Sequence, residues 1–440
     1  MKEKLSLRII IHLIEFGGSL GILYFLKKFL SESHHHELNT IMPILVDIAF
    51  LAVIASFGSK FAKMIGIAPM AGNIFLGIIA GPAIFNVLQP DALGVQLALL
   101  AGVLFILFEA GLHFDLEDLK KNLSIATKVA LLGVAIPLGS FTLLGFYFFN
   151  LSLIQAIFLG GIFTATSVGL SVEALKRAGK LNTSLGNKII GAAIIDDILG
   201  VVILSTLSKM AGGNFSIEGL LLLAFSIISF IVGTYALWSW GIADKIEKYI
   251  DSHYKNTTGV YTRFFFGSLI GAGALAGIIG LEPVLGAFGI GVVLSKIDND
   301  VKNSTWEKIE AYMHIFAGGF LVSIGTLLPR SAVISGKVWL LAILFTIIGF
   351  AGKYVVKYLF SNKTEGKQVA YAMSIRGEVG LVFVAVAIAN NILDETYASA
   401  ALLGVIIVTV VGAILFEKSV TKEKNKQENS EPQYYADLSL

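Results

Sequence analysis

Two adjacent carboxylates, Asp196 and Asp197, lie in a long apolar run at residues 185–210. A charged side chain at bilayer depth costs several kcal/mol, so a chain keeps one there only for a compensating use. Two carboxylates this close resist simultaneous ionisation, and their protonation is coupled. A carboxylate in a wet cavity can therefore hold either a proton or a small cation such as Na⁺, which is the chemistry of an ion exchanger. Neighbours on a helix point about 100° apart, so one carboxylate can face the cavity while the other turns toward a partner. A purely structural ion pair fits Asp196 better than Asp197.

Two apolar spans contain signals for an interrupted helix. FTATSVG at 163–169 crowds β-branched and hydroxyl residues before a glycine, and RGEVG at 376–380 places a glycine between two charges. Interrupted helices expose backbone N–H and C=O groups, which are tolerated only around a buried cavity, and their half-helix dipoles act on ions. The polar side chains at these interruptions are Thr164, Thr166, Ser167, Arg376 and Glu378. The alternative for the hydroxyl groups is ordinary hydrogen bonding between helices.

Other charges inside apolar runs suit a supporting role. Lys353 lies in IIGFAGKYVVKYLF, and Glu173 lies shortly after the first interruption. We expect Arg376 to pair with Glu173 or Glu378, and Lys353 to bind backbone carbonyls, because breaking a buried ion pair is costly. Direct contact of these groups with the ion is the alternative.

Composition indicates how these residues are positioned. Hydrophobic residues make up 55% of the 440-residue chain and charged residues 15%, whereas soluble domains carry roughly 25% charged residues. The chain is therefore expected to be an integral membrane protein. Crossing a hydrocarbon core of about 30 Å takes roughly 20 apolar residues. Fourteen runs qualify, at about 8–30, 42–64, 68–90, 94–113, 124–148, 153–175, 185–210, 215–242, 259–279, 283–298, 307–328, 334–360, 366–390 and 394–416.

The basic residues predict the orientation of these spans. With fourteen spans, 26 of the 33 Lys and Arg residues fall on the side that holds both termini, and five fall on the other side. The positive-inside rule then places both termini in the cytoplasm. We also expect the protein to lie in the plasma membrane.

Small residues recur at one long offset. Pro69, Gly72 and Gly77 have the spacing P-x2-G-x4-G, and the same spacing returns in the second half of the chain, starting at Pro283. The offset between these two motifs also relates Gly111 to Gly325, and 161–170 to 375–384. Six spans thus map onto six others across one bridging span, which predicts an inverted repeat, an architecture that places a transporter's substrate site near mid-membrane.

The expected organisation has five parts, and the polar tail is expected to be disordered. These are an extra N-terminal helix and loop (1–41), the first repeat (42–210), a linker helix and cytoplasmic loop (211–258), the second repeat (259–416) and the cytoplasmic tail (417–440).

TATSVGLSVEAL at 164–175, GAAIIDDILG at 191–200 and FEAGLHFDLEDL at 108–119 together resemble the monovalent cation:proton antiporters. The resemblance is to their second main family, whose bacterial sodium/proton members carry an Asp-Asp pair. It implies an all-helical sodium/proton antiporter fold with two crossed broken helices, in a homodimer whose protomers each have a scaffold and a mobile core. It also implies that Asp197 is the essential carboxylate for cation and proton, that Asp196 assists it, and that Thr164 lies in the unwound segment beside it.

One departure from the family bears on stoichiometry. Electrogenic members carry a lysine on the helix equivalent to 307–328, but residues 309–329 contain none, and Ser323 is the candidate for its place. The sequence therefore favours electroneutral exchange of Na⁺ or Li⁺ for protons, with a charge-carrying role for Asp196 or Lys353 as the alternative.

Other functions are less favoured. Potassium/proton antiport or potassium efflux within the same superfamily, and a passive cation channel, are the competing functions. No segment resembles a selectivity filter, a nucleotide-binding domain or a cofactor site, so we expect a transporter rather than an enzyme, with no cofactor, nucleotide or nucleic-acid partner.

Overall fold

The computed structural model of the chain describes residues 14–22, 24–25, 38–65, 69–114, 116–211, 217–254, 258–281, 283–389 and 392–430. These residues are helical or lie in the connections between helices, and none of them forms a β-strand. Of the extra N-terminal segment, residues 14–22 and 24–25 are helical. Phe16 packs on Phe57 of the following helix, with ring centroids 6.1 Å apart.

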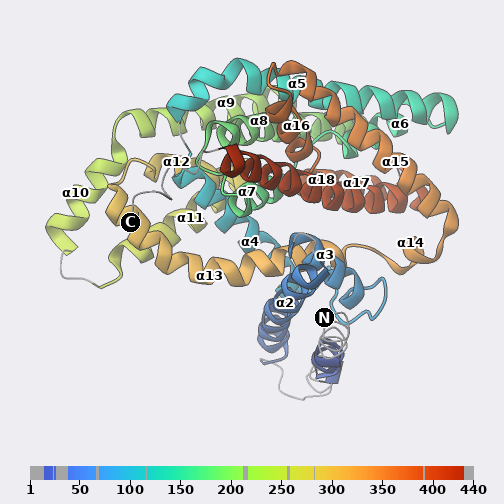
Figure 1. The fold of residues 1–440 in the computed structure, drawn as a ribbon, viewed down its shortest axis with the longest axis horizontal. Coiled ribbons are helices and arrows are strands. Elements are labelled where there is room, and N and C mark those ends of the chain that lie inside the picture. The colour runs from blue at the N-terminus through green and yellow to red at the C-terminus, as the bar shows by residue number, and fades with distance from the viewer. Residues whose placement is uncertain are drawn as a thin grey trace, which may run out of the picture.

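The helices follow in the order shown in Figure 1. The first half comprises α2 (Leu38–Ile65), α3 (Pro69–Ala80), α4 (Leu93–Leu112), α5 (Leu116–Phe148), α6 (Leu153–Ile162), α7 (Val168–Arg177) and α8 (Ser184–Ala211). The connection comprises α9 (Ile217–Ser239) and α10 (Ile242–Tyr254). The second half comprises α11 (Val260–Ile278), α12 (Pro283–Leu294), α13 (Asn299–Thr326), α14 (Arg330–Ile334), α15 (Gly336–Tyr354), the 3₁₀ helix η1 (Val355–Leu359), α16 (Lys363–Met373), α17 (Glu378–Ala389) and α18 (Glu395–Ser430).

The helices pack as two groups, each drawn from both halves of the chain. Helices α5 to α8 and α15 to α18 pack mainly on one another, and we call them the core bundle. Helices α2, α3, α4, α11, α12 and α13 pack mainly on one another, and we call them the scaffold bundle. In Figure 1, α11 and α12 lie to the left, and α6 and α15 to the right.

Helix length distinguishes continuous spans from short or interrupted ones. Six described helices are individually long and apolar enough to cross a membrane, and a seventh span is formed if α9 and α10, bent by 54° at their junction, count as one. Helices α3, α6 and α12 are apolar but shorter. The structure is therefore that of a multi-pass membrane protein, and the described residues do not confirm the count of fourteen spans.

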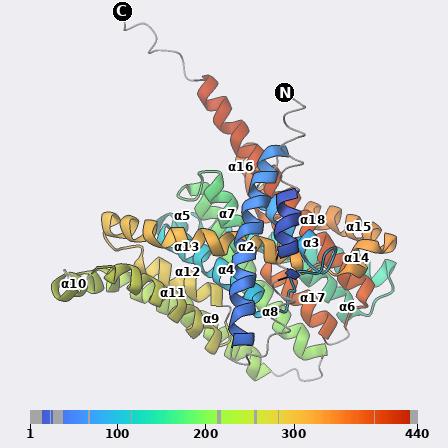
Figure 2. The ribbon, with the colours of Figure 1, turned by 90° about the horizontal axis from the view of Figure 1, so that it is seen from below.

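Local sequence explains where the helices depart from the expected spans. The expected span 68–90 is a helix only to Ala80, because Pro82 has no N–H and disfavours helical conformation at Gly81. Helix α13 begins earlier than hydropathy indicates, because the Asp298 side chain caps it by accepting from the Asp300 and Val301 amides. The tail was expected to be disordered from 417, but α18 continues to Ser430 and extends beyond the bundles (Figure 2).

The internal repeat is visible in the helix boundaries. The offset between the two P-x2-G-x4-G motifs relates both ends of α3 to those of α12, the end of α4 to that of α13, and the start of α5 to that of α14. The offset then shortens. If the offset stayed constant, α16 would end at Arg376 and α17 would begin at Val382. In the structure, α16 ends at Met373 and α17 begins at Glu378. The expected match of 161–170 to 375–384 was therefore displaced by a few positions, because the second half is shorter before its interrupted helix.

The repeated glycines make the contacts between the halves. A Cβ atom on Gly77 would lie 3.0 Å from the Cα of Gly325, and a Cβ atom on Gly111 would lie 3.0 Å from the Cα of Gly291. Gly291 is the repeat equivalent of Gly77, and Gly325 is that of Gly111. The same contact is therefore made twice with the halves exchanged, as a pseudo-twofold axis requires. Only glycine allows helix backbones to approach this closely.

Candidate functional site

The two interrupted helices meet in the core bundle. The chain leaves α6 at Ile162 and re-enters a helix at Val168, and it leaves α16 at Met373 and re-enters one at Glu378. The Ser167 amide donates to the Ile375 carbonyl at 2.9 Å, and the Thr166 hydroxyl donates to the Met373 carbonyl at 2.9 Å. The Ser167 hydroxyl accepts from the Leu170 amide at 3.1 Å and so caps α7. Each interruption therefore completes the hydrogen bonding of the other.

Arg376 satisfies the backbone of the first interruption. Its guanidinium donates to the carbonyls of Thr164 at 2.8 Å, Ala165 at 3.1 Å and Gly349 at 3.1 Å. The side chain is 1% exposed. These contacts are to backbone carbonyls, whereas we expected a carboxylate partner, either Glu173 or Glu378. Carbonyls at a helix end have no intrahelical donor, and the planar guanidinium presents several donors to them at once.

Of the two glutamates considered as partners of Arg376, Glu173 is engaged elsewhere and the pairing with Glu378 stays a prediction. Glu173 pairs with Arg177, one helical turn away on α7, at 2.7 Å. The backbone of Glu378 begins α17, and its side chain lies outside the described residues.

The Thr164 hydroxyl donates to the Gly161 carbonyl at 2.7 Å, so it closes the last turn of α6.

Asp196 forms a buried ion pair with Lys353. The Lys353 ammonium donates to Oδ2 of Asp196, and the Thr166 hydroxyl donates to the same oxygen at 2.7 Å. Both charged side chains are 0% exposed. We expected Lys353 to bind backbone carbonyls, which was wrong, because Arg376 already occupies those of the first interruption. Oδ1 of Asp196 has no hydrogen-bond partner among the described residues.

Asp197 follows on α8 and is 7% exposed. Together with Asp196, Lys353 and Arg376 it makes a buried cluster of two carboxylates and two basic side chains. This set is neutral when all four groups are ionised. A monovalent cation that enters it adds one positive charge, which is costly to bury unless a proton leaves.

Ser323 does not take part in this cluster. Its hydroxyl donates to the Gly319 carbonyl at 2.8 Å and to the Val95 carbonyl at 3.3 Å, within the scaffold bundle. The lysine that reaches Asp196 comes from α15 instead. The expectation that Ser323 stands in the place of a lysine beside Asp196 was therefore wrong.

A second ion-pair network, which the sequence did not reveal, joins the two bundles. Lys176 at the end of α7 contacts Glu109 of α4 and Glu310 of α13, each at 2.7 Å. The Trp306 indole also donates to Glu109, at 3.0 Å. Lys176 counts in the sequence only as one of many basic loop residues, and although Glu109 lies in the FEAGLHFDLEDL motif, nothing in that motif indicates a contact with Lys176.

Known antiporters resemble this chain in sequence and in fold. The family described as "Sodium/hydrogen exchanger, transmembrane" matches residues 23–418. The Na(+)/H(+) antiporter of Enterococcus hirae is 30% identical over 383 residues, which is 86% of this chain and 98% of that protein. The Na(+)/H(+)-K(+) antiporter GerN of Bacillus cereus is 27% identical, over 83% of this chain and 93% of that protein. The solved structure of the sodium proton antiporter MjNhaP1 from Methanocaldococcus jannaschii at pH 8 has the same fold, with a TM-score of 0.58, 17% identity, and coverage of 88% of this chain and 97% of that chain.

Proposed function

This chain belongs to the sodium/hydrogen exchanger family, and on that premise we propose that it exchanges Na⁺, and also Li⁺, for protons by alternating access. The observation that carries the proposal is the Asp196–Asp197 pair, buried in the core bundle where the interrupted helices meet. A transporter of this kind requires a site that holds one substrate at a time. Two neighbouring carboxylates supply it, because their charge is neutralised either by protons or by a cation.

The residues around the pair have separate roles. Asp197 is the principal ligand, because the family resemblance matches it to the essential carboxylate, and Asp196, which is bound by Lys353 and Thr166, assists it. Asp196 offers the cation its Oδ1 atom, which the described residues leave without a hydrogen bond. Ser167 and Arg376 keep the interruption open by satisfying its backbone groups. The remaining polar groups around the cation come from the start of α7, after Ser167, and from protein oxygens near the interruption.

Lys353 decides whether the exchange moves charge. The sequence favoured electroneutral exchange because residues 309–329 hold no lysine, but Lys353 contacts Asp196 from α15. A cation bound between the carboxylates competes with the Lys353 ammonium for Asp196. An ammonium left without its counter-charge at this depth is costly. We therefore propose that Lys353 releases its proton as Asp197 does, so that two protons leave for each cation and the cycle is electrogenic.

Placement and assembly extend the proposal. We propose that the protein lies in the plasma membrane, and the excess of basic residues on one side supports a cytoplasmic position for both termini. The family resemblance supports a homodimer in which the scaffold bundles meet and the core bundles move.

Transport of K⁺ is the second candidate, and the name of the Bacillus cereus relative favours it. A passive channel is also separable from exchange by experiment. An exchanger uses an imposed cation gradient to drive protons uphill, whereas a channel only dissipates gradients. Testing Na⁺, Li⁺ and K⁺ in turn on liposomes with a pH-sensitive dye resolves both alternatives.

The site assignment is tested by conservative substitutions in reconstituted liposomes. Asp197→Asn keeps the shape of the side chain but removes its charge, so we expect no cation-dependent proton flux from a folded protein. Asp197→Glu keeps the carboxylate and displaces it, so partial activity with altered apparent affinity is expected. Asp47→Asn is the matched control, since Asp47 is a buried carboxylate of the scaffold bundle, 2% exposed.

Two outcomes contradict this assignment. One is Asp197→Asn exchange near the wild-type rate, and the other is equal loss in Asp47→Asn. The wild-type titration adds a further readout, because a proton and a cation compete for Asp197. The apparent KM for Na⁺ should fall as pH rises, and a KM that stays flat across about two pH units excludes competition at one carboxylate.

A further inference from the structure

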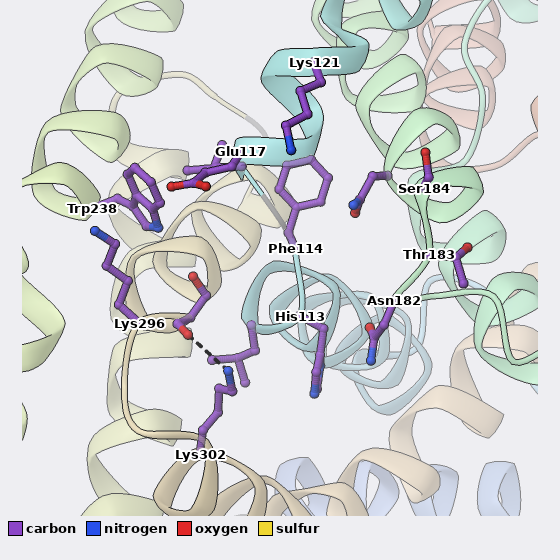
Figure 3. Close-up of a pocket in the computed structure, with 14 residues that line it drawn as sticks. His113, Phe114, Glu117, Lys121, Asn182, Thr183, Ser184, Trp238, Lys296 and Lys302 are labelled. Atoms are coloured by element: carbon purple, nitrogen blue, oxygen red, sulfur yellow. Dashed lines mark hydrogen bonds between the residues drawn. The ribbon is translucent and has the colours of Figure 1, made fainter.

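A polar cavity of about 640 Å³ lies apart from the ion site, where several interhelical connections meet. On the scaffold side it is lined by His113 after α4, and by Lys296 and Lys302 around the start of α13. On the core side it is lined by Lys121 of α5 and by the connection that enters α8. Figure 3 shows Lys121 and Lys302 extending from opposite sides toward the middle of this space, with Asn182 and His113 at its border.

The cavity has the charge of an anion site. Three of the described residues that line it are lysines, and one, Glu117, is acidic. Lys302 is 8% exposed, and its ammonium donates to the Ser295 carbonyl at 3.1 Å. Within the described part of the chain, no carboxylate lies at ion-pair distance from Lys302, and Asp298 acts on its charge from farther away. A buried ammonium whose direct partner is a carbonyl rather than a carboxylate is costly, and an anion in the cavity would lower this cost.

Neighbouring groups support the same charge preference. Burial lowers the pKa of the His113 imidazole, and the nearby Lys302 and Lys176 ammoniums lower it further, against an opposing contact with the Glu109 carbonyl. The side chains of Asn182 and Ser184 add an amide and a hydroxyl donor on the opposite wall, whereas the Thr183 hydroxyl already donates to the Lys180 carbonyl. Lysine ammoniums together with neutral donors suit the oxygens of a phosphate group.

We propose that this cavity binds a phosphate group and thereby joins the core bundle to the scaffold bundle. The group belongs either to a free anion or to the headgroup of an anionic lipid. Trp238 supports the lipid source, because it lines the cavity with Lys296 4.0 Å from its ring centroid, and tryptophan at a membrane surface sits at headgroup depth. An effect of the bound phosphate on transport rests on the proposed exchange function, but its binding does not.

Binding is tested on the full-length protein without any transport assay. The thermal unfolding midpoint is measured in detergent against rising inorganic phosphate, with chloride at equal ionic strength as reference. A parallel series compares nanodiscs of phosphatidylglycerol with nanodiscs of phosphatidylcholine. We expect a saturable rise in the midpoint with phosphate, with phosphatidylglycerol, or with both. A rise with phosphate assigns the site to free anions as well, and a rise with phosphatidylglycerol alone assigns it to lipid headgroups.

Variants separate the site from general ionic effects. Lys302→Met should weaken the phosphate effect about tenfold, the loss expected for one charge-assisted hydrogen bond. Lys121→Gln, at an exposed position, gives a second test if Lys302→Met does not fold. Lys337→Gln is the control, because it removes an exposed lysine outside the cavity. The proposal is overturned if neither source stabilises the wild type beyond its reference, or if Lys302→Met and Lys121→Gln respond as Lys337→Gln does.

Discussion

Lys353 and Asp196 are the two residues whose contact most affects the proposed transport stoichiometry. Both are fully buried, and the Thr166 hydroxyl completes the group. Removing one member of such a pair strands the other charge and typically costs about 3–5 kcal/mol, whereas removing both costs much less. Breaking the pair should therefore change both the stability of the protein and its transport, and both can be measured on the same variants.

We predict that Lys353→Gln reduces the charge moved per cation, because only the Asp197 proton remains to be exchanged. Currents on a solid-supported membrane after a Na⁺ jump should fall strongly, while dye-reported exchange persists. Lys357→Gln, a neighbouring lysine that stacks on Tyr354 at 4.0 Å, should keep wild-type currents. Undiminished current in Lys353→Gln would exclude Lys353 as a proton carrier. The Asp196→Asn change should restore part of the stability that Lys353→Gln loses.

Sequence reasoning reached some of this site and missed the rest for a physical reason. The carboxylate pair and Thr166 stand out because polar groups are rare in apolar runs. The partners of the buried basic side chains cannot be predicted in this way, because hydropathy identifies a buried cation but does not show which acceptor it contacts. Lys353 and Asp196 are 157 residues apart in the chain. Their contact depends on how the core bundle brings α15 and α8 together.

At the level of helices, the repeated glycines pack against backbone atoms of the other half rather than against its side chains. A Cβ atom at Gly77 would overlap the carbonyl oxygen of Val322, and one at Gly325 would overlap that of Ile74. Both obstacles are backbone atoms, which cannot rotate away as a side chain can. The sequence located these glycines through their common offset, but not the change of offset near the second interruption, because no residue pattern marks a deletion within an apolar span.

We predict that Gly77→Ala destabilises the protein by about 1–3 kcal/mol, the usual cost of overpacking a tight contact. The control is Gly139→Ala in the interior of α5, where a new Cβ atom meets nothing within 4 Å. That change should be neutral or stabilising, because alanine is favoured over glycine inside a helix. Thermal unfolding of the two variants in detergent checks the difference. Equal midpoints would show that α3 and α13 can separate freely.

At the level of the whole molecule, the core and scaffold bundles are connected by the network around Lys176. If the core moves during transport, the contacts of Lys176 with Glu109 and Glu310 must break and re-form in each cycle. Glu109 is nearly buried and also bonded by Trp306, whereas the Glu310 side chain is 29% exposed. Glu310 is therefore the partner that can be removed with the least damage to the fold.

We predict that Glu310→Gln loosens the connection between the bundles without unfolding either one. A partly exposed ion pair contributes up to about 1 kcal/mol, so amide hydrogens of α7 should exchange a few times faster in hydrogen–deuterium exchange. Glu307→Gln, an exposed neighbour on α13 without a described ion pair, is the control. Identical exchange of α7 in both variants would show that Lys176 does not hold the bundles together.

The exchanged glycine contacts also limit how the gene for this protein can vary. Enlarging residue 77 presses on residue 325, and enlarging residue 291 presses on residue 111. In each half, two positions are thus restricted to glycine by the backbone of the other half. At these four positions neither half can diverge alone.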